Sequence, residues 1–301
     1  MSRPTTARMA STNLGGGASY RSLEGKVAIV TGGSRGIGAA ISENLASKGC
    51  SLVLNYTSES SAEKTSTLAS HLETTYSIKA ISVQADMGSE TGPAHLISVA
   101  KNNFSHPKTG KFQIDILINN AGVSKNMSID EVTADEFAKQ YNVNVRGPLL
   151  LVKAAEPFLP HDRSGRIINI SSVSSSLGFH RQSIYGGTKA ALEAMTRTWS
   201  RELSERCTVN SVNPGPVATD MYGATDPVFQ EQMSWWTRNA PLARAREGVD
   251  REEFVRDAPK HGGRPAYDHE IAGVVGMLVG EESGWCTGSV VCANGGFRMS
   301  G

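Results

Sequence analysis

The chain has 301 residues, of which 39% are hydrophobic and 20% are charged, an ordinary composition for a protein that buries a sizeable core. A formal net charge of +1 gives no reason to expect nucleic acid as a partner, and the apolar runs are too short to cross a membrane. The four cysteines lack the spacing of metal ligands. We therefore expect reduced thiols, a cytoplasmic protein and no metal site.

The first 22 residues differ in composition from the rest of the chain. They contain three arginines, many serines and threonines, and no acidic residue, as organelle transit peptides do. However, Pro4 and the glycines at 15–17 would interrupt a sustained amphipathic helix. We predict a flexible N-terminal tail over 1–22, with a transit peptide as the open alternative, and one folded domain over 23–301.

From Lys26 onward, short apolar runs alternate with longer helical stretches. Strands are predicted at 26–32, 51–56, 80–86, 114–122, 166–173, 208–215 and 289–296. Helices are predicted at 36–48, 61–76, 135–159 and 182–203, with one more after the third strand. Apolar strands that alternate with helices predict an α/β fold, a single doubly wound parallel sheet of the Rossmann type with helices on both faces.

One region breaks this alternation. Residues from about 221 to 266 hold two apolar clusters and then a charged, turn-rich stretch, "RAREGVDREEFVRDAPKHGGRP". A long connection of this kind is either a lid over an active site or a tolerated surface insertion. The residues leave both interpretations open.

A glycine-rich stretch, "TGGSRGIG" at 31–38, follows the first predicted strand and opens the first helix. Glycines at 32, 36 and 38 allow a sharp turn and a close approach to a diphosphate, and the helix start offers free N–H groups to that anion. The spacing is Gly-x-x-x-Gly-x-Gly. In this strand–turn–helix context it predicts a dinucleotide site.

Six further motifs follow in order: "NNAG" (119–122), "NVRG" (144–147), "INISSV" (168–173), "YGGTK" (185–189), "NPGPVAT" (213–219) and "NGG" (294–296). With the glycine turn, they make the chain resemble the short-chain dehydrogenase/reductase family over residues 24–301. Family members commonly have an aspartate where Asn294 stands. The resemblance implies an oxidoreductase with a nicotinamide cofactor that assembles as a homodimer or homotetramer.

Tyr185 and Lys189 lie four residues apart, so they share a helix face. A phenol has an ordinary pKa near 10, and a nearby ammonium favours its ionised form. The resemblance assigns Tyr185 as general acid, Lys189 as its partner and ribose ligand, and Ser172 as the hydroxyl that holds the substrate oxygen. Ser171 should point to the opposite face of the strand. Asn144 would hold a water beside the lysine; a structural hydrogen bond is its alternative role.

The cofactor is predicted to be NADPH/NADP+. Dehydrogenases that prefer NAD carry an acid near the end of the second strand, whereas residues 55–58 offer none and Glu59 is the first carboxylate. Arg35 in the glycine turn could bind a 2′-phosphate, although a solvated side chain is the alternative. The resemblance places the cofactor against Gly32, Ser34, Arg35, Gly36, Ile37, Gly38, Tyr56, Thr57, Ser58, Asp86, Met87, Asn120, Ala121, Gly122, Tyr185, Lys189, Pro214, Gly215, Val217 and Thr219.

The segment after "NPG" carries the residues expected near the substrate: Met221, Tyr222, Phe229, Met233, Trp235 and Trp236. They could line a pocket for a bulky or aromatic ketone, or pack the lid against the body or a second subunit. His180 and Arg181 could touch a polar substrate group or lie in solvent. The stretch 241–265 looks longer than its family counterpart.

The predicted function is NADPH-dependent reduction of a ketone to a secondary alcohol, with a 3-ketoacyl thioester or a polyketide-like aromatic ketone as first candidates. Two alternatives stay open. The same fold could serve an isomerase, dehydratase or cyclase, or it could be a regulatory module that binds NAD(P) without turnover. Intact Ser172, Tyr185 and Lys189 argue against the second of these.

Overall fold

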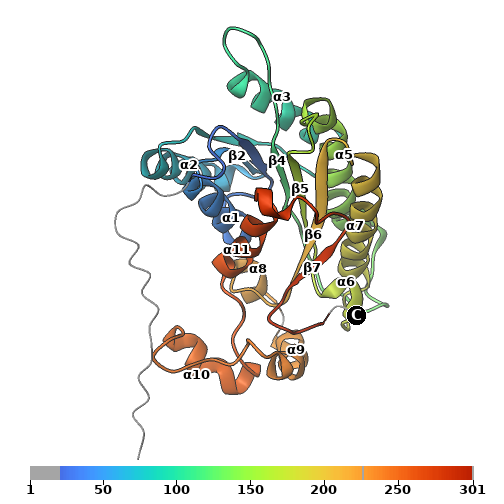
Figure 1. Ribbon diagram of the computed structural model, residues 1–301. Helices are drawn as coiled ribbons and strands as arrows, with labels where there is room; N and C mark the ends of the chain where they lie inside the picture. The colour runs from blue at the N-terminus through green and yellow to red at the C-terminus, as the bar shows by residue number, and fades with distance from the viewer. Residues whose placement is uncertain (1–20, 226, 300–301) are drawn as a thin grey trace, which may run out of the picture.

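The seven predicted strands form one parallel sheet in the order β3-β2-β1-β4-β5-β6-β7 (Figure 1). The computed structural model describes residues 21–225 and 227–299, so most of the predicted tail lies outside the described residues. The strands are β1 (Val27–Val30), β2 (Ser51–Tyr56), β3 (Ala80–Gln84), β4 (Ile116–Asn119), β5 (Gly165–Ile170), β6 (Cys207–Pro214) and β7 (Val290–Ala293). The predicted fold class is confirmed.

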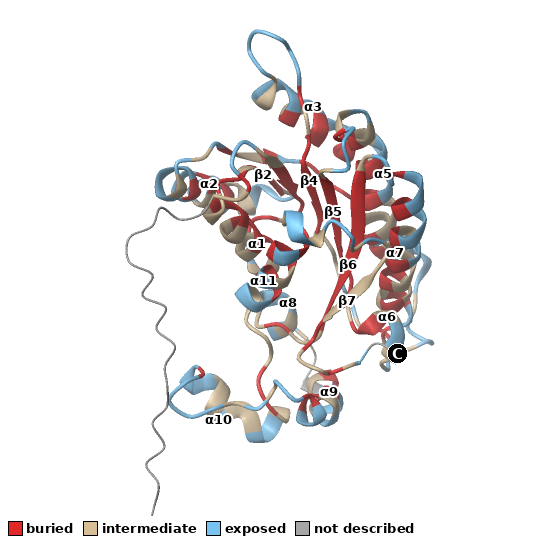
Figure 2. Ribbon diagram, viewed as in Figure 1, coloured by how far each residue is buried: buried red, intermediate tan, exposed pale blue. Residues whose placement is uncertain are grey.

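Helices cover both faces of this sheet (Figure 1). The described helices are α1 (Gly36–Ser47), α2 (Ala62–Tyr76), α3 (Gly92–Phe104), α4 (Ala134–Tyr141), α5 (Gly147–Ala155), α6 (Ser174–Leu177), α7 (Ser183–Glu202), α8 (Asp220–Gly223), α9 (Pro227–Asn239), α10 (Glu252–His261) and α11 (Asp268–Leu278). Apolar side chains of α1, α2 and α11 form one core cluster with the sheet, and those of α3, α5 and α7 form the other. Because both faces are covered, β5 and β6 are buried along their whole length (Figure 2).

The sheet changes direction between β1 and β4. The chain builds β1, β2 and β3 outward to one side, then returns to place β4 against the free edge of β1. In doubly wound sheets, ligands bind at the carboxyl ends of the strands at such a switch point. The glycine turn after β1 and the Asn119–Gly122 segment after β4 meet there.

The long helix predicted over 135–159 is interrupted. A π-helical turn, Asn142–Arg146, separates α4 from α5, and a 3-10 turn, Glu156–Phe158, ends the stretch. Pro148 explains the break, because it has no N–H to donate to the carbonyl of Asn144 four residues earlier. The predicted strand 114–122 is also shorter, ending at Asn119.

The segment predicted as a lid or insertion contains three helices, α8, α9 and α10, which the sequence pattern did not predict. Figure 1 shows α9 and α10 beyond the end of the sheet where β6 and β7 finish. Buried Arg264 anchors this segment, with its guanidinium 3.0 Å from Asp250 and 2.8 Å from Glu270 at the start of α11. In the part of the chain that the structure describes, no helix has both the length and the apolar character to span a bilayer.

Candidate active site

The glycine turn has the backbone that a dinucleotide site needs. Gly32 and Gly36 adopt left-handed conformations, with φ of +62° and +52°, which side chains disfavour. A Cβ built on Gly38 would lie 2.2 Å from the Gly32 carbonyl oxygen, so only glycine fits there. These restrictions place the turn and the start of α1 against each other, with free N–H groups at the helix start.

Two asparagines hold the turn in place. Asn120 Nδ2 donates to the carbonyl oxygens of Thr31 at 2.9 Å and Gly32 at 3.1 Å. Asn55, fully buried at the end of β2, accepts from the Gly32 N–H at 3.3 Å and donates to the Ala85 carbonyl at 2.9 Å. In the sequence, Asn55 was notable only because it is not an acid. In the structure, its hydrogen bonds join the ends of β1, β2 and β3.

Ser172 and Tyr185 meet beyond the end of β5. Ser172 lies just after that strand, and its hydroxyl lies close enough to the Tyr185 phenol, in the first turn of α7, to favour the ionised form of the phenol. The Ser172 Oγ atom donates to Ser174 Oγ at 3.1 Å. Its Oγ also accepts from the Ser174 N–H at 3.2 Å. Ser171 points away, as strand alternation predicts, and its Oγ donates to Glu193 at 2.7 Å.

Lys189 is buried one helical turn after Tyr185. Its Nζ atom lies 5.6 Å from the centre of the Tyr185 ring and donates to the Ile170 carbonyl at 2.8 Å. Burial lowers the pKa of Lys189 to about 8, with the nearby Glu193 carboxylate opposing the change. The same loss of water raises the pKa of Tyr185 to about 12, against the opposing hydrogen bond from Ser172. In the polypeptide alone, therefore, burial outweighs the groups that would favour the phenolate, and the net change in the pKa of the phenol is upward.

Asn144 sits in the π-helical turn, and both ends of its side-chain amide are hydrogen-bonded. Its Oδ1 accepts from the Val123 N–H at 2.9 Å, and its Nδ2 donates to the Val123 carbonyl at 2.8 Å and to Thr188 Oγ1 at 3.1 Å. This is the structural role that we considered as the alternative. The residue is nevertheless close to Lys189: a Cβ built on Gly122 would lie 3.5 Å from both Asn144 Oδ1 and Lys189 Nζ.

The end of β6 closes the other side of the glycine turn. Pro214 and Gly215 lead into Val217, which is buried, and Thr219, which begins α8 by accepting from the Tyr222 N–H at 3.4 Å. A Cβ built on Gly36 would lie 3.0 Å from the Thr219 methyl group. The predicted cofactor segments after β1 and β6 are therefore in contact.

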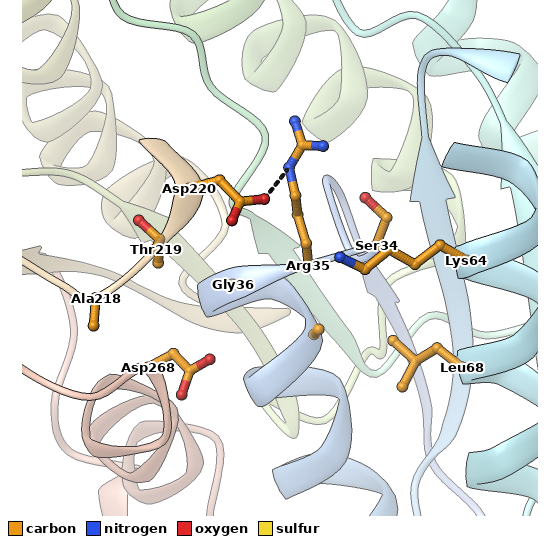
Figure 3. Close-up of a pocket in the computed structure, with 10 residues that line it drawn as sticks. Ser34, Arg35, Gly36, Lys64, Leu68, Ala218, Thr219, Asp220 and Asp268 are labelled. Atoms are coloured by element: carbon orange, nitrogen blue, oxygen red, sulfur yellow. Dashed lines mark ion pairs between the residues drawn. The ribbon is translucent and has the colours of Figure 1, made fainter. Parts of the chain in front are cut away.

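Arg35 points toward α8, where its Nε lies 3.7 Å from Asp220 in an exposed ion pair (Figure 3). Both line a pocket of about 320 Å³ at the start of α1, together with Lys64 from α2 and Asp268 from α11 (Figure 3). The pocket wall does not include Tyr56, Thr57 or Ser58. Sequence reasoning missed Lys64, Asp220 and Asp268, because no motif or spacing marks charged residues on three separate helices.

The predicted cofactor contacts after β3 differ in exposure. Asp86 is exposed after β3, where its Oδ1 accepts from the Gly88 N–H at 2.8 Å. The Met87 side chain is 2% exposed and packs in the core with α3 and α5. A contact from Met87 to a cofactor would therefore have to come from its main chain.

The aromatic residues expected near the substrate mostly pack against one another. Phe229, Met233 and Trp236 of α9 form a cluster with Phe179 and Phe297 from the body of the protein. This favours the interpretation that they pack the lid to the body. A hollow of about 200 Å³ remains beside the cluster, lined by Leu177, Gly178, Phe179, His180, Phe229, Gln232, Met233 and Trp236.

The remaining residues on this side lie at the surface. Trp235 is 61% exposed and Met221 is 47% exposed. His180 is exposed as well, whereas Arg181 pairs with Glu131 at 3.1 Å. Of these four, Trp235 alone has a ring contact with the aromatic cluster, with its ring centre 4.9 Å from that of Trp236.

A seven-stranded parallel sheet, a glycine turn at its switch point, and a Ser–Tyr–Lys group beside that turn together define a nucleotide-binding oxidoreductase of the α/β class. The family model of the short chain dehydrogenases matches residues 26–227. The chain therefore belongs to the short-chain dehydrogenase/reductase family, whose members act on CH–OH and C=O groups with a nicotinamide cofactor.

Two similar proteins cover nearly the whole chain. L-xylulose reductase of Aspergillus niger is 55% identical over 297 residues, which is 93% of this chain and 99% of that protein. L-xylo-3-hexulose reductase of Hypocrea jecorina is 48% identical over 306 residues, with the same coverage. Among solved structures, the angucycline C-6 ketoreductase LanV with bound NADP matches with a TM-score of 0.77, 32% identity, and coverage of 92% of this chain and 96% of that one.

Proposed function

We propose that the protein reduces the keto group of a small polyhydroxylated ketone, a ketose, to a secondary alcohol with NADPH. The observation that carries this proposal is the placement of Ser172, Tyr185 and Lys189 together at the carboxyl edge of the sheet, with the Lys189 Nζ atom 5.6 Å from the centre of the Tyr185 ring. The substrate class is supported by the two relatives of 55% and 48% identity, both named as sugar reductases.

In this mechanism Ser172 donates a hydrogen bond to the substrate oxygen and Tyr185 transfers its phenolic proton to that oxygen. Bound NADPH supplies the hydride that the carbonyl carbon accepts. The Tyr185 phenol holds its proton firmly, since burial raises its pKa to about 12, so it is a protonated acid before the reaction. As the carbonyl oxygen gains negative charge, it becomes basic enough to take that proton. The Lys189 ammonium, close to the ring, stabilises the phenolate that is left.

The preference for the phosphorylated cofactor rests on residues around the start of α1. Arg35 and Lys64 bring two cations to a pocket that Asp220 and Asp268 also line, and no carboxylate occurs at 55–58, where an NAD-specific site would carry one. The Arg35–Asp220 ion pair is exposed and therefore weak, so Arg35 can turn to a 2′-phosphate at little cost. A solved relative of 32% identity is a complex with NADPH.

The alternative substrate is a bulky aromatic ketone, as the name of a hydroxynaphthalene reductase-like protein of 33% identity suggests for that relative. The aromatic side chains of α9 favour the alternative less than their number suggests, because they are already packed against Phe179 and Phe297. A 3-ketoacyl thioester has no support of this kind.

We also propose that the protein works in the cytoplasm as a homodimer or homotetramer. Its four cysteines are free thiols, as a reducing compartment favours. Phe137 and Leu149, on α4 and α5, are each 45% exposed, and such apolar side chains on neighbouring helices suit a contact between subunits.

The test is NADPH oxidation with a panel of L-xylulose, a 3-ketohexose, a naphthol-type ketone and a 3-ketoacyl thioester. We expect the two sugars to have the highest kcat/KM. A strong preference for the naphthol-type ketone would overturn the proposed substrate class but leave the proposed reductase activity standing. Tight NADPH binding without turnover of any ketone would refute the proposed function and favour a binding module or another reaction class.

A further inference from the structure

Glu193 is a buried acid one helical turn after Lys189 on α7, and the mechanism above does not use it. Its Oε1 atom accepts hydrogen bonds from Ser171 Oγ and Ser175 Oγ, each at 2.7 Å, and from Asn213 Nδ2 at 3.1 Å. A buried carboxylate is costly unless donors satisfy it. Three donors on one oxygen therefore indicate a defined position inside the protein.

The three donors come from the segments that surround Ser172. Ser171 is its chain neighbour, Ser175 lies in α6 just beyond it, and Asn213 ends the adjacent strand β6. Asn213 Nδ2 also donates to the Ser172 carbonyl at 3.0 Å. One amide thus connects the Glu193 carboxylate to the backbone of the residue proposed to hold the substrate oxygen.

Glu193 also affects the charge of Lys189. Burial works against the ammonium, and the negative charge of Glu193 works in its favour. The segments β5, β6 and α6 contribute only serine and asparagine side chains to this network. Arg146 of the π-helical turn points elsewhere, to the Gly88 carbonyl and Glu90. The titratable groups that the structure places beside Lys189 are Glu193 and Tyr185, both on α7, and the Tyr141 phenol of α4 packs against Gly187 on the same helix.

We propose that Glu193 is a positioning residue of this reductase. Through Ser171, Ser175 and Asn213 it fixes the turn that carries Ser172, and its buried carboxylate, one helical turn from Lys189 on α7, favours the ammonium form of that side chain. It touches neither substrate nor cofactor and acts through these neighbours. The inference rests on the proposed function, since it takes Ser172 and Lys189 as working groups.

The first experiment needs no ketone. Glu193→Gln keeps the size and an acceptor oxygen but removes the charge, and NADPH affinity is followed against pH by nicotinamide fluorescence. Because the Lys189 ammonium is the proposed ribose ligand, affinity should fall as it loses its proton. We expect the midpoint of this fall to move down by about one pH unit in Glu193→Gln. Glu202→Gln, exposed on the same helix, should leave it in place. An unmoved midpoint in folded Glu193→Gln overturns the charge role.

Turnover tests the positioning role. In Glu193→Gln we expect kcat for the best ketose to fall about tenfold with KM within about twofold, because the Ser172 turn loosens while the binding groups remain. If that variant does not fold, Ser175→Ala tests the positioning role instead. It removes one donor from a half-buried site, and kcat should fall about threefold at constant KM. An unchanged kcat overturns the positioning role.

Failure of the proposed function would look different. If the wild-type protein binds NADPH but reduces no ketone, the reductase assignment is wrong. The proposed positioning of Ser172 for reduction is then wrong as well. The pH dependence of NADPH binding would still decide, in the same protein, whether Glu193 controls the charge of Lys189.

Discussion

The carboxyl end of β5 and the segment 221–266 are built in opposite ways. Around β5 the functional side chains lie at the ends of buried strands, where Ser171, Lys189 and Asn213 each make hydrogen bonds within the sheet or to α7. The segment 221–266 consists of short, largely exposed helices held by an aromatic cluster and by the Arg264 ion pairs (Figure 2). The difference suggests that the first region sets the rate of the chemistry, and that the second sets access and substrate choice.

The sharpest test of this division is Tyr185→Phe. It removes only the proton donor, so we expect kcat to fall by about 10²- to 10⁴-fold while NADPH affinity stays within about twofold. Steady-state kinetics and fluorescence titration measure the two effects. Tyr141→Phe, which removes a phenol from neighbouring α4, is the matched control and should keep full activity. Turnover of Tyr185→Phe within tenfold of wild type would take Tyr185 out of the role of acid.

Lys189→Met should separate activity from stability. We expect at least about a 100-fold loss of kcat/KM, because the phenolate loses its partner. Burial lowers the pKa of Lys189 to about 8, below the 10.5 of the unfolded chain, so wild-type stability should increase as pH rises from about 8 to 10.5. In that interval the unfolded chain holds a proton that the folded one has released.

The measurement for Lys189→Met is chemical denaturation across this pH interval. The variant lacks the titrating group, so its free energy of unfolding should not show the rise with pH that Lys189 contributes between about 8 and 10.5. At pH 7 it should be at least as stable as wild type. A wild-type protein whose stability does not rise in the interval would show that Lys189 is well solvated.

Arg35→Ala tests the cofactor preference at the border between the two regions. One charge-assisted contact contributes about 1.5–3 kcal/mol, so NADPH should bind about 10- to 100-fold more weakly, with NADH changed by less than about threefold. Asp220→Asn is the complementary variant. It frees Arg35 from an exposed ion pair and should tighten NADPH binding slightly. Equal losses for both cofactors in Arg35→Ala would contradict a phosphate contact.

The smallest effect on catalysis is expected from the lid. Arg264→Met removes the buried cation that joins Asp250 to Glu270, while the Arg246 N–H still donates to Asp250. Removing one partner of a buried ion pair costs at most about 3–5 kcal/mol. We expect KM for the ketone to rise by up to about tenfold with kcat nearly constant, and 241–265 to be cleaved faster by protease. Arg256→Met, exposed on α10, is the control. A fall in kcat instead of a rise in KM would break the proposed division between the regions.

Some of the site could be predicted because its signals are local. The glycine spacing, the strand ends and the four-residue offset of Tyr185 and Lys189 each depend on a short stretch of chain. The π-helical turn was missed although Pro148 was visible, because a helical pattern on both sides of a proline does not say how the chain passes it. Glu193 was missed because its three donors come from three other elements.

The sequence by itself determined the parallel sheet and the glycine turn, because apolar periodicity and motif spacing act over one strand or one helix at a time. Its resemblance to a known family predicted the roles of Ser172, Tyr185 and Lys189. Only the tertiary structure decided that Asn144 is hydrogen-bonded to Val123 and Thr188, that Arg35 forms an ion pair with Asp220, and that burial raises the pKa of Tyr185. Each of these features depends on contacts between groups far apart in the chain and on the loss of water around them. Local sequence spacing encodes neither the contacts nor the loss of water.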